Sequence, residues 1–340
     1  MSICILHNRL RMLTLPIQAK PSLNRALVQH ILFPAHPDRF FMYTENSTNV
    51  ALIVEDAYFS EFVGPDAPFS DITSYDEVFR ALEVEATDES RNAPLITELA
   101  APLSRAGISI FYISTYQTDL FLVAENRLPD VISSLRAQKF TFDDVSSVPL
   151  SPGSEQHFDH QGDADTPPTL PSQITTIQKE VPQPPPSPTD IAEEVRREER
   201  RAVRDGDLAM AGLNLEFVEL WGSVVVKVLL YPELLPNSES PDRFVSYTAT
   251  RDGVSIVADS QSLEVFNEDW LNRSLDAQPL RLIQFSLDGF DKDRHGIVHS
   301  VTKPLSVEGI PLLYLSTILT ANVLVGIHDA PRALKVLDAA

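Results

Sequence analysis

Two histidines and two related turns hold the residues of this sequence whose types and spacing could do chemistry. His295 and His299 stand four residues apart, a spacing that places two metal ligands on one face of a helix. Gly296, which lies between them, indicates that His295 precedes the helix, so we expect no metal site. The sequence also lacks a Gly-x-Gly-x-x-Gly fingerprint, a Walker loop, a Gly-x-Ser-x-Gly elbow and a His-Glu-x-x-His motif. We therefore expect no catalytic residues, no cofactor and a function that is not enzymatic.

The other candidate is the segment 107–119, which reads Gly-Ile-Ser-Ile-Phe-Tyr-Ile-Ser-Thr-Tyr-Gln-Thr-Asp, and its counterpart ending in Ser316-Thr317. Where a helix gives way to a strand, free backbone N–H and C=O groups can capture the zwitterion of an amino acid. A simple helix cap at Gly107 and a bulge at Ser114-Thr115 would explain the same residues. Because the pattern occurs twice, both interpretations remain open.

The elements that position this segment follow from hydrophobic periodicity. The leucines at 95, 99 and 103 share one helical face, and the β-branched and aromatic runs around them are typical of strands. The pattern predicts a strand, a helix, two strands, a helix and a strand, at 79–85, 95–105, 108–114, 120–124, 129–138 and from 140. The resulting order is βαββαβ, the ferredoxin-like arrangement.

An internal repeat extends this pattern to the whole chain. The tetrapeptide Pro-Asp-Arg-Phe at 37–40 recurs at 241–244, and Pro-Leu-Ser at 102–104 recurs at 304–306. We therefore expect an α/β (α+β) fold of four ferredoxin-like βαββαβ modules in two duplicated halves, joined by a disordered linker. The expected modules, called the first to fourth segments below, are 1–66, 72–144, 211–270 and 277–340.

The expected linker, 145–210, is acidic and rich in proline, and it includes Pro184-Pro185-Pro186. Such a composition cannot bury a core. Within it, a short charged helix should begin near Asp190, whose apolar positions Ile191, Val195 and Ala202 form only a thin stripe. We expect this helix to be exposed to solvent.

Composition limits the partners. The 340 residues contain 27 Lys and Arg against 48 Asp and Glu, so the net charge is −21. Such a chain repels phosphate, and we expect neither nucleic acid nor an anionic membrane as a partner. Cys4 is the single cysteine, and no run of about 18 apolar residues occurs, so we expect no disulfide, no membrane insertion and a cytoplasmic location.

Three sequence motifs and the order of the modules resemble those of a known family. The run Ile-Ser-Thr-Tyr-Gln-Thr-Asp at 113–119, Gly289-Phe290-Asp291 with Gly296-Ile297-Val298 ahead of Pro304-Leu305, and the four-module layout resemble the CASTOR family. These proteins are cytosolic arginine sensors built from ACT domains. The resemblance implies that an amino acid, arginine or another, binds between the second and fourth segments. It also implies that binding alters contact with a protein partner of the GATOR/TOR-regulatory type.

The resemblance further implies roles for individual residues. Ser109 and Ile110 would meet the polar end of the ligand, and Thr317 and Ile318 its side-chain end. The loop that closes over the ligand would contain Gly289, Phe290, Asp291, His295, Gly296 and Val298, and it is lengthened by Lys292, Asp293 and Arg294.

Two further positions concern specificity and partner contact. Ala321 stands where the family has an aspartate that pairs with guanidinium, which predicts a ligand with a neutral side chain or none. Tyr116, Gln117 and Asp119 would face solvent and contact the partner.

Two other functions remain possible. One is a ligand-independent ACT scaffold that docks on a signalling complex, and the other is a regulatory subunit of an amino-acid-metabolic enzyme. Because exposed sheet edges pair readily, a homodimer is also possible.

Overall fold

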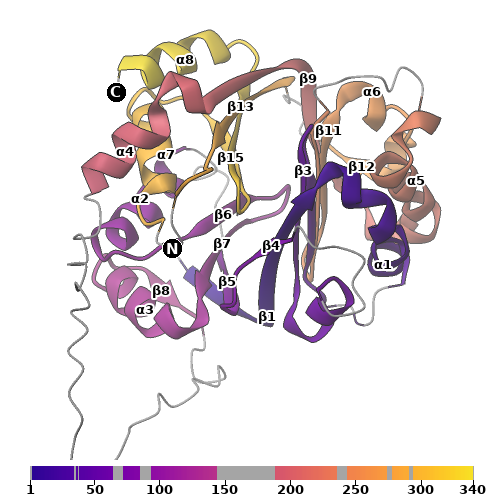
Figure 1. The fold of residues 1–340 in the computed structure, drawn as a ribbon, viewed down its shortest axis with the longest axis horizontal. Helices are drawn as coiled ribbons and strands as arrows, with labels where there is room; N and C mark the ends of the chain where they lie inside the picture. The colour runs from indigo at the N-terminus through magenta and orange to yellow at the C-terminus, as the bar shows by residue number, and fades with distance from the viewer. Residues whose placement is uncertain are drawn as a thin grey trace, which may run out of the picture.

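The computed structural model describes residues 2–33, 36, 38–63, 72–84, 93–143, 188–235, 243–273, 278–290 and 294–339 (Figure 1). The strands are β1 (Ser2–Pro16), β2 (Phe41–Glu45), β3 (Asn49–Glu55), β4 (Thr73–Ser74), β5 (Phe79–Val84), β6 (Phe111–Ser114), β7 (Asp119–Ala124), β8 (Thr141–Phe142), β9 (Arg201–Leu213), β10 (Val245–Thr250), β11 (Gly253–Asp259), β12 (Leu271–Asn272), β13 (Leu280–Ser286), β14 (Leu312–Ser316) and β15 (Thr320–Gly326). The helices are α1 (Lys20–Leu32), α2 (Ala93–Arg105), α3 (Leu128–Arg136), α4 (Pro188–Arg196), α5 (Val218–Leu230), α6 (Ser260–Leu263), α7 (Ile297–Val307) and α8 (Ala330–Ala339).

Twelve of these strands form one closed antiparallel ring, in the order β11-β10-β2-β3-β1-β5-β7-β6-β14-β15-β13-β9 and back to β11. The prediction of four ferredoxin-like βαββαβ modules in two duplicated halves is therefore wrong. The physical reason is that two long strands are shared. The first part of β1 pairs with β5 and its second part pairs with β3, while β9 divides in the same way between β13 and β11. No segment has a sheet to itself.

Three apolar cores hold the ring. One fills its interior with side chains from all four segments, among them Met42, Phe111, Val257 and Leu324. The other two lie outside, one under α1 and α5 and one under α2, α3, α4, α7 and α8. Figure 1 shows these two groups of helices on opposite sides of the strands.

Part of the expected linker is ordered. Helix α4 buries Ile191 (2% exposed) and Val195 (0% exposed) in the core that also contains α7, so the expectation of a solvated helix is wrong. Strand β9 begins at Arg201, ahead of the expected start of the third segment at 211. Both elements belong to the folded structure because their apolar side chains have partners that lie far away in the sequence.

In the parts of the chain that the structure describes, every helix is too short or too polar to span a bilayer.

Candidate ligand-binding site between the second and fourth segments

The two helix-to-strand corners have the same construction. Gly107 follows α2 with φ +63°, and Ile108 N–H donates to Leu103 O at 2.9 Å. In the fourth segment Gly309 has φ +65°, and Ile310 N–H donates to Leu305 O at 2.9 Å. The predicted glycine at the end of the helix is thus confirmed at Gly107.

The strands that follow these corners, β6 and β14, meet at a seam. Their ladder contains one residue pair, Ile113 opposite Leu315. Two serines extend it, because Tyr112 N–H donates to Ser316 Oγ at 2.9 Å and Tyr314 N–H donates to Ser114 Oγ at 3.1 Å. The rings of Tyr112 and Tyr314 pack edge to face, with centroids 6.4 Å apart. The repeated serines therefore have a structural role at this seam.

The loop after β13 carries much of the predicted site and lies against the second segment. Gly296, with φ +89°, precedes α7, and a Cβ atom there would lie 2.9 Å from Ser104 Oγ on α2. A side chain at this position would require Ser104 or the loop to shift. Val298 and His295 are buried, with 3% and 7% exposure, and Phe290 packs with Ile110 against the core under α2 and α7. The loop thus lies against residues of the second segment.

Arg294 closes this loop. Its guanidinium donates to Ile318 O and, at 3.2 Å, to Phe290 O, so it connects the loop to the turn between β14 and β15. A second arginine, Arg200, lies over the Phe290 ring with its Cζ 4.7 Å from the centroid and donates to Asp288 O at 2.6 Å. Gly289, with φ +80°, lies between these contacts. The predicted site residue Asp291, with Lys292 and Asp293, lies outside the described residues.

The predicted side-chain end of the site is not one cavity. Thr317 and Ile318 form a tight turn in which Thr317 N–H donates to Thr320 O at 2.9 Å, and beside them lies a void of about 10 Å³. This volume is near the minimum for a single water molecule. Ile318 belongs to the interior core of the ring, whereas Ala321, 1% exposed, belongs to the outer core under α2 and α7. The two residues therefore face opposite sides of the sheet.

Ser109 instead lines a cavity of about 270 Å³. Its lining residues are Tyr75, Glu77, Phe79, Ser109, Phe111, Ala124, Asn126 and Arg127. Pairing of Phe79 with Ala124 across β5 and β7 brings Glu77 and Asn126 to the same end of the sheet. These polar residues belong to no sequence motif, so they were not predicted as site residues. The one feature of the sequence that could have indicated them is that they flank strands that pair.

Two titratable side chains near the site have shifted pKa values. Burial lowers the pKa of His299, and the nearby cations Lys303 and Arg105 lower it further. Within the described ranges, no group of three or more His, Cys, Asp or Glu side chains could hold a metal ion. Burial also raises the pKa of Tyr75, which Arg294 opposes.

The polar corner between β6 and β7 is packed against the third segment. Tyr116 N–H donates to Ser255 Oγ at 2.8 Å, and Ser255 Oγ donates to Gln117 Oε1 at 2.9 Å. A Cβ atom at Gly212 would lie 2.6 Å from the Tyr116 ring, so the two approach closely. Tyr116, Gln117 and Asp119 are half-buried, and the expectation that they face solvent is wrong.

Comparison with known proteins finds relatives along the whole chain. The sequence profile of the ACT domain matches residues 75–137. The human protein named cytosolic arginine sensor for mTORC1 subunit 1 is 25% identical over 354 residues, covering 99% of this chain and 98% of that protein. Its rat counterpart is 25% identical over 332 residues, covering 93% and 90%. The human putative protein CASTOR3P is 34% identical over 115 residues, covering 32% of this chain and 68% of that protein.

The duplicated chain and the ACT-domain match define an ACT-domain regulatory protein. More particularly, the chain belongs to the CASTOR family. Among solved structures, aspartate kinase from Synechocystis aligns over 98% of this chain and 54% of that chain, with 11% identity and a TM-score of 0.32, a likeness that supports no argument.

Proposed function

We propose that this protein is a cytoplasmic, non-enzymatic sensor that binds a free amino acid between its second and fourth segments. The observation that carries this proposal is the loop after β13, which leaves one segment and lies on the other at Gly296 and Ser104. A ligand held between them would change how the two segments meet. Such a change in packing would transmit ligand binding to a protein partner.

The ligand has a neutral side chain. The position expected for a guanidinium-pairing carboxylate is Ala321, which is buried and apolar. Arg294 already places a guanidinium on Ile318 O, so a cationic ligand side chain would meet a like charge there. The polar end of the ligand would enter the cavity at Ser109, where Glu77 and Arg127 supply both signs of charge.

The partner is a protein of the GATOR/TOR-regulatory type. The family resemblance assigns its contact to Tyr116, Gln117 and Asp119. Because Tyr116 and Gln117 hydrogen-bond to Ser255 in the third segment, partner binding would depend on how the two halves pack.

A ligand-independent scaffold is the second candidate, and Arg294 favours it. By joining Phe290 to Ile318, this side chain closes the loop without a ligand. In that case the loop would be permanently shut and only the docking function would remain.

Thermal unfolding with each of the twenty amino acids at millimolar concentration separates the two candidates, because a ligand that binds the folded state raises the melting temperature. We expect a rise with a neutral amino acid, lost in Ser109→Asp and kept in Ser133→Asp, an exposed position on α3. Absence of any rise, with co-purification of the partner unaffected by every amino acid, would support the scaffold. A rise with arginine alone would contradict the assignment of ligand class.

A further inference from the structure

The turn between β10 and β11, residues 251–253, contacts the second segment across the ring, and we call it the hairpin tip. Arg251 Nη2 donates to Glu83 Oε2 on β5 at 2.9 Å. Gly253 approaches the corner between β6 and β7 so closely that a Cβ atom there would lie 2.5 Å from Gln117 Nε2. The hairpin tip therefore lies against both a buried carboxyl group and the corner.

Glu83 is 3% exposed and faces the interior of the ring. Its neighbours in the two ladders, Cys4 on β1 and Leu120 on β7, both pack against the interior core. Among the described residues, the charged and titratable groups that face Glu83 are the Cys4 thiol, Arg251 and Asp252. Apart from the thiol, these groups belong to the hairpin tip.

Two carboxyl groups share one guanidinium at this contact. Besides its bond to Glu83, Arg251 places its Nε 3.3 Å from Asp252 Oδ2. Burial and a hydrogen bond to the Asp252 carboxylate together raise the pKa of Glu83 to about 7, whereas Thr118 in the corner and Arg251 lower it. Once Glu83 has lost its proton, two carboxylates remain beside a single cation.

The duplicated half builds the same position without a carboxyl group. Gln284 on β13 is the equivalent of Glu83, because it pairs with Asn322 as Glu83 pairs with Leu120, 202 residues earlier. Gln284 Nε2 donates to Asn322 Oδ1 at 2.8 Å, and its Oε1 accepts from Arg204 at 3.0 Å. A neutral amide thus fills this place in the ring with both of its ends hydrogen-bonded.

The turn that corresponds to the hairpin tip is uncharged as well. The offset of 204 residues between the two Pro-Asp-Arg-Phe copies relates Ser47 and Thr48 to Arg251 and Asp252. Closing the ring therefore requires neither a carboxyl group nor a guanidinium at this contact. The ionisable side chains occur in one half alone, and what they add is a dependence on protons.

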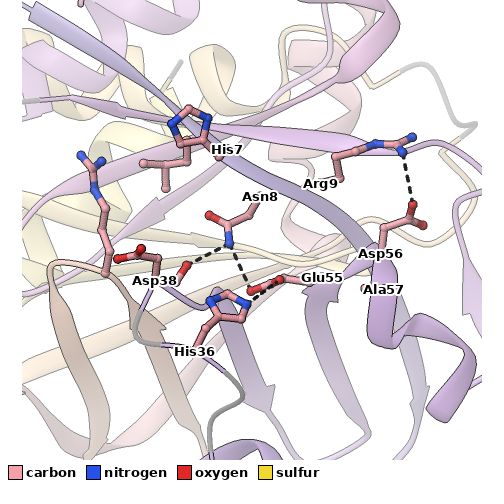
Figure 2. A pocket seen from close by; sticks show the side chains of 10 residues that line it. His7, Asn8, Arg9, His36, Asp38, Glu55, Asp56 and Ala57 are labelled. Atoms are coloured by element: carbon pink, nitrogen blue, oxygen red, sulfur yellow. Dashed lines mark hydrogen bonds and ion pairs between the residues drawn. The ribbon is translucent and has the colours of Figure 1, made fainter. Parts of the chain in front are cut away.

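The hairpin tip also borders open space. Arg251, whose side chain is 40% exposed, lines a cavity of about 530 Å³ together with residues that include His7 and Asp38. Figure 2 shows the side chains around this cavity. A space of this size holds several water molecules, so the hairpin tip can move into it without unpacking the core inside the ring.

We propose that the contact between the hairpin tip and the second segment is controlled by a proton. The contact is closed while Glu83 and Asp252 share one proton, and it opens when both carry charge, because the two carboxylates then repel each other in a largely buried site. Opening also releases Tyr116 and Gln117, whose hydrogen bonds with Ser255 join the corner to the same hairpin. The contact lies within the chain, so this inference does not rest on the proposed function.

Amide hydrogen exchange at pH 6 and pH 8, measured by NMR and corrected for the intrinsic pH dependence of exchange, tests this proposal. The reporter is Tyr116 N–H, which donates to Ser255 Oγ on the hairpin at 2.8 Å. With a pKa of about 7 when the contact is closed and 4.5 when Glu83 is released, opening should increase about tenfold between the two pH values. Thr317 N–H, at the equivalent corner, should keep its corrected rate.

Three variants complete the test. Glu83→Gln, which copies the duplicated half, should abolish the increase, and Asp252→Asn should reduce it because the neighbouring carboxylate is removed. Glu98→Gln, at an exposed position on α2, should retain it. The proposal is overturned if the corrected rate of Tyr116 is equal at both pH values or if Glu83→Gln or Asp252→Asn retains the whole increase. It is also overturned if Thr317 accelerates as much as Tyr116, since the response would then belong to the whole fold.

Discussion

At the scale of single residues, Arg294 connects the loop after β13 to the turn between β14 and β15. Its hydrogen bonds to Ile318 O and Phe290 O would be lost in Arg294→Ala, which should reduce the free energy of unfolding by about 1–3 kcal/mol because two partly buried carbonyls lose a charged donor. L-arginine at millimolar concentration should then raise the melting temperature of the variant more than that of the natural chain. Arg332→Ala, which removes an exposed arginine, is the control.

Glu83 gives the protein a pH-dependent stability. Burial and a hydrogen bond to the Asp252 carboxylate together raise the pKa of this carboxyl to about 7, against the lowering effect of Arg251. The folded state therefore holds the proton more tightly than the unfolded chain does. This contribution to stability is full below the ordinary value of 4.5 and is lost as the pH rises through about 7.

Glu83→Gln cannot ionise, so it should lose less stability between about pH 5 and pH 8 than the natural chain does. Urea unfolding at both pH values measures the difference. Glu264→Gln, at an exposed position, should retain the natural dependence. An equal loss in all three proteins would show that Glu83 does not titrate in this range.

The sequence could not predict the directions in which the candidate site residues point. Ile318 lies in the turn between β14 and β15 whereas Ala321 lies in β15, so the alternation of side chains along a strand does not relate their directions. The structure places them in different cores. Gly296 was predicted as part of the loop, but its contact with Ser104 depends on a helix almost two hundred residues away and has no local signal.

At the scale of elements, α4 and the turn after it hold the loop after β13. The guanidinium of Arg200 covers Phe290 and donates to Asp288 O, so Arg200→Ala should release the loop without unfolding α7. Hydrogen exchange of amides in 287–296 should accelerate about tenfold, while α1 exchanges as before. Arg197→Ala, on an exposed arginine of the same region, should change neither. Unchanged exchange in Arg200→Ala would contradict this coupling.

The corner between β6 and β7 is an internal contact, and its strength is measurable. Gln117→Ala and Ser255→Ala each remove one side of a hydrogen bond between the second and third segments. A double-mutant cycle should give a coupling of about 0.5–1.5 kcal/mol by urea unfolding. Thr48→Ala combined with Gln117→Ala is the uncoupled comparison. A coupling near zero for the first pair would show that the corner moves freely in solution.

At the scale of the whole molecule, neither half can complete the ring. The halves join where β2 pairs with β10 and where β6 pairs with β14. Expressed alone, residues 1–143 or 188–339 would expose both of these strand edges, and we expect each half to associate or aggregate. Together they should form a one-to-one complex in size-exclusion chromatography with light scattering. Two independently folded monomers would contradict the closed ring.

The sequence predicted most of the individual strands and helices but not the ring. Periodicity locates β5, β6 and β7 because each needs only local alternation. Closure depends on which strands pair, and pairs such as Tyr43 with Tyr247 join residues about two hundred positions apart. One signal was present: β1, at 15 residues, is longer than a single small sheet requires.

The shared interior of the ring also constrains how this chain can evolve. Met42, Phe111, Val257 and Leu324 come from four different segments but fill one volume. Because interiors are close-packed, an added methylene in one segment has to be matched by a smaller side chain in another. Duplication usually frees one copy to diverge. Here a substitution in one half has to be compensated by a substitution in the other half, so selection acts on the two halves together.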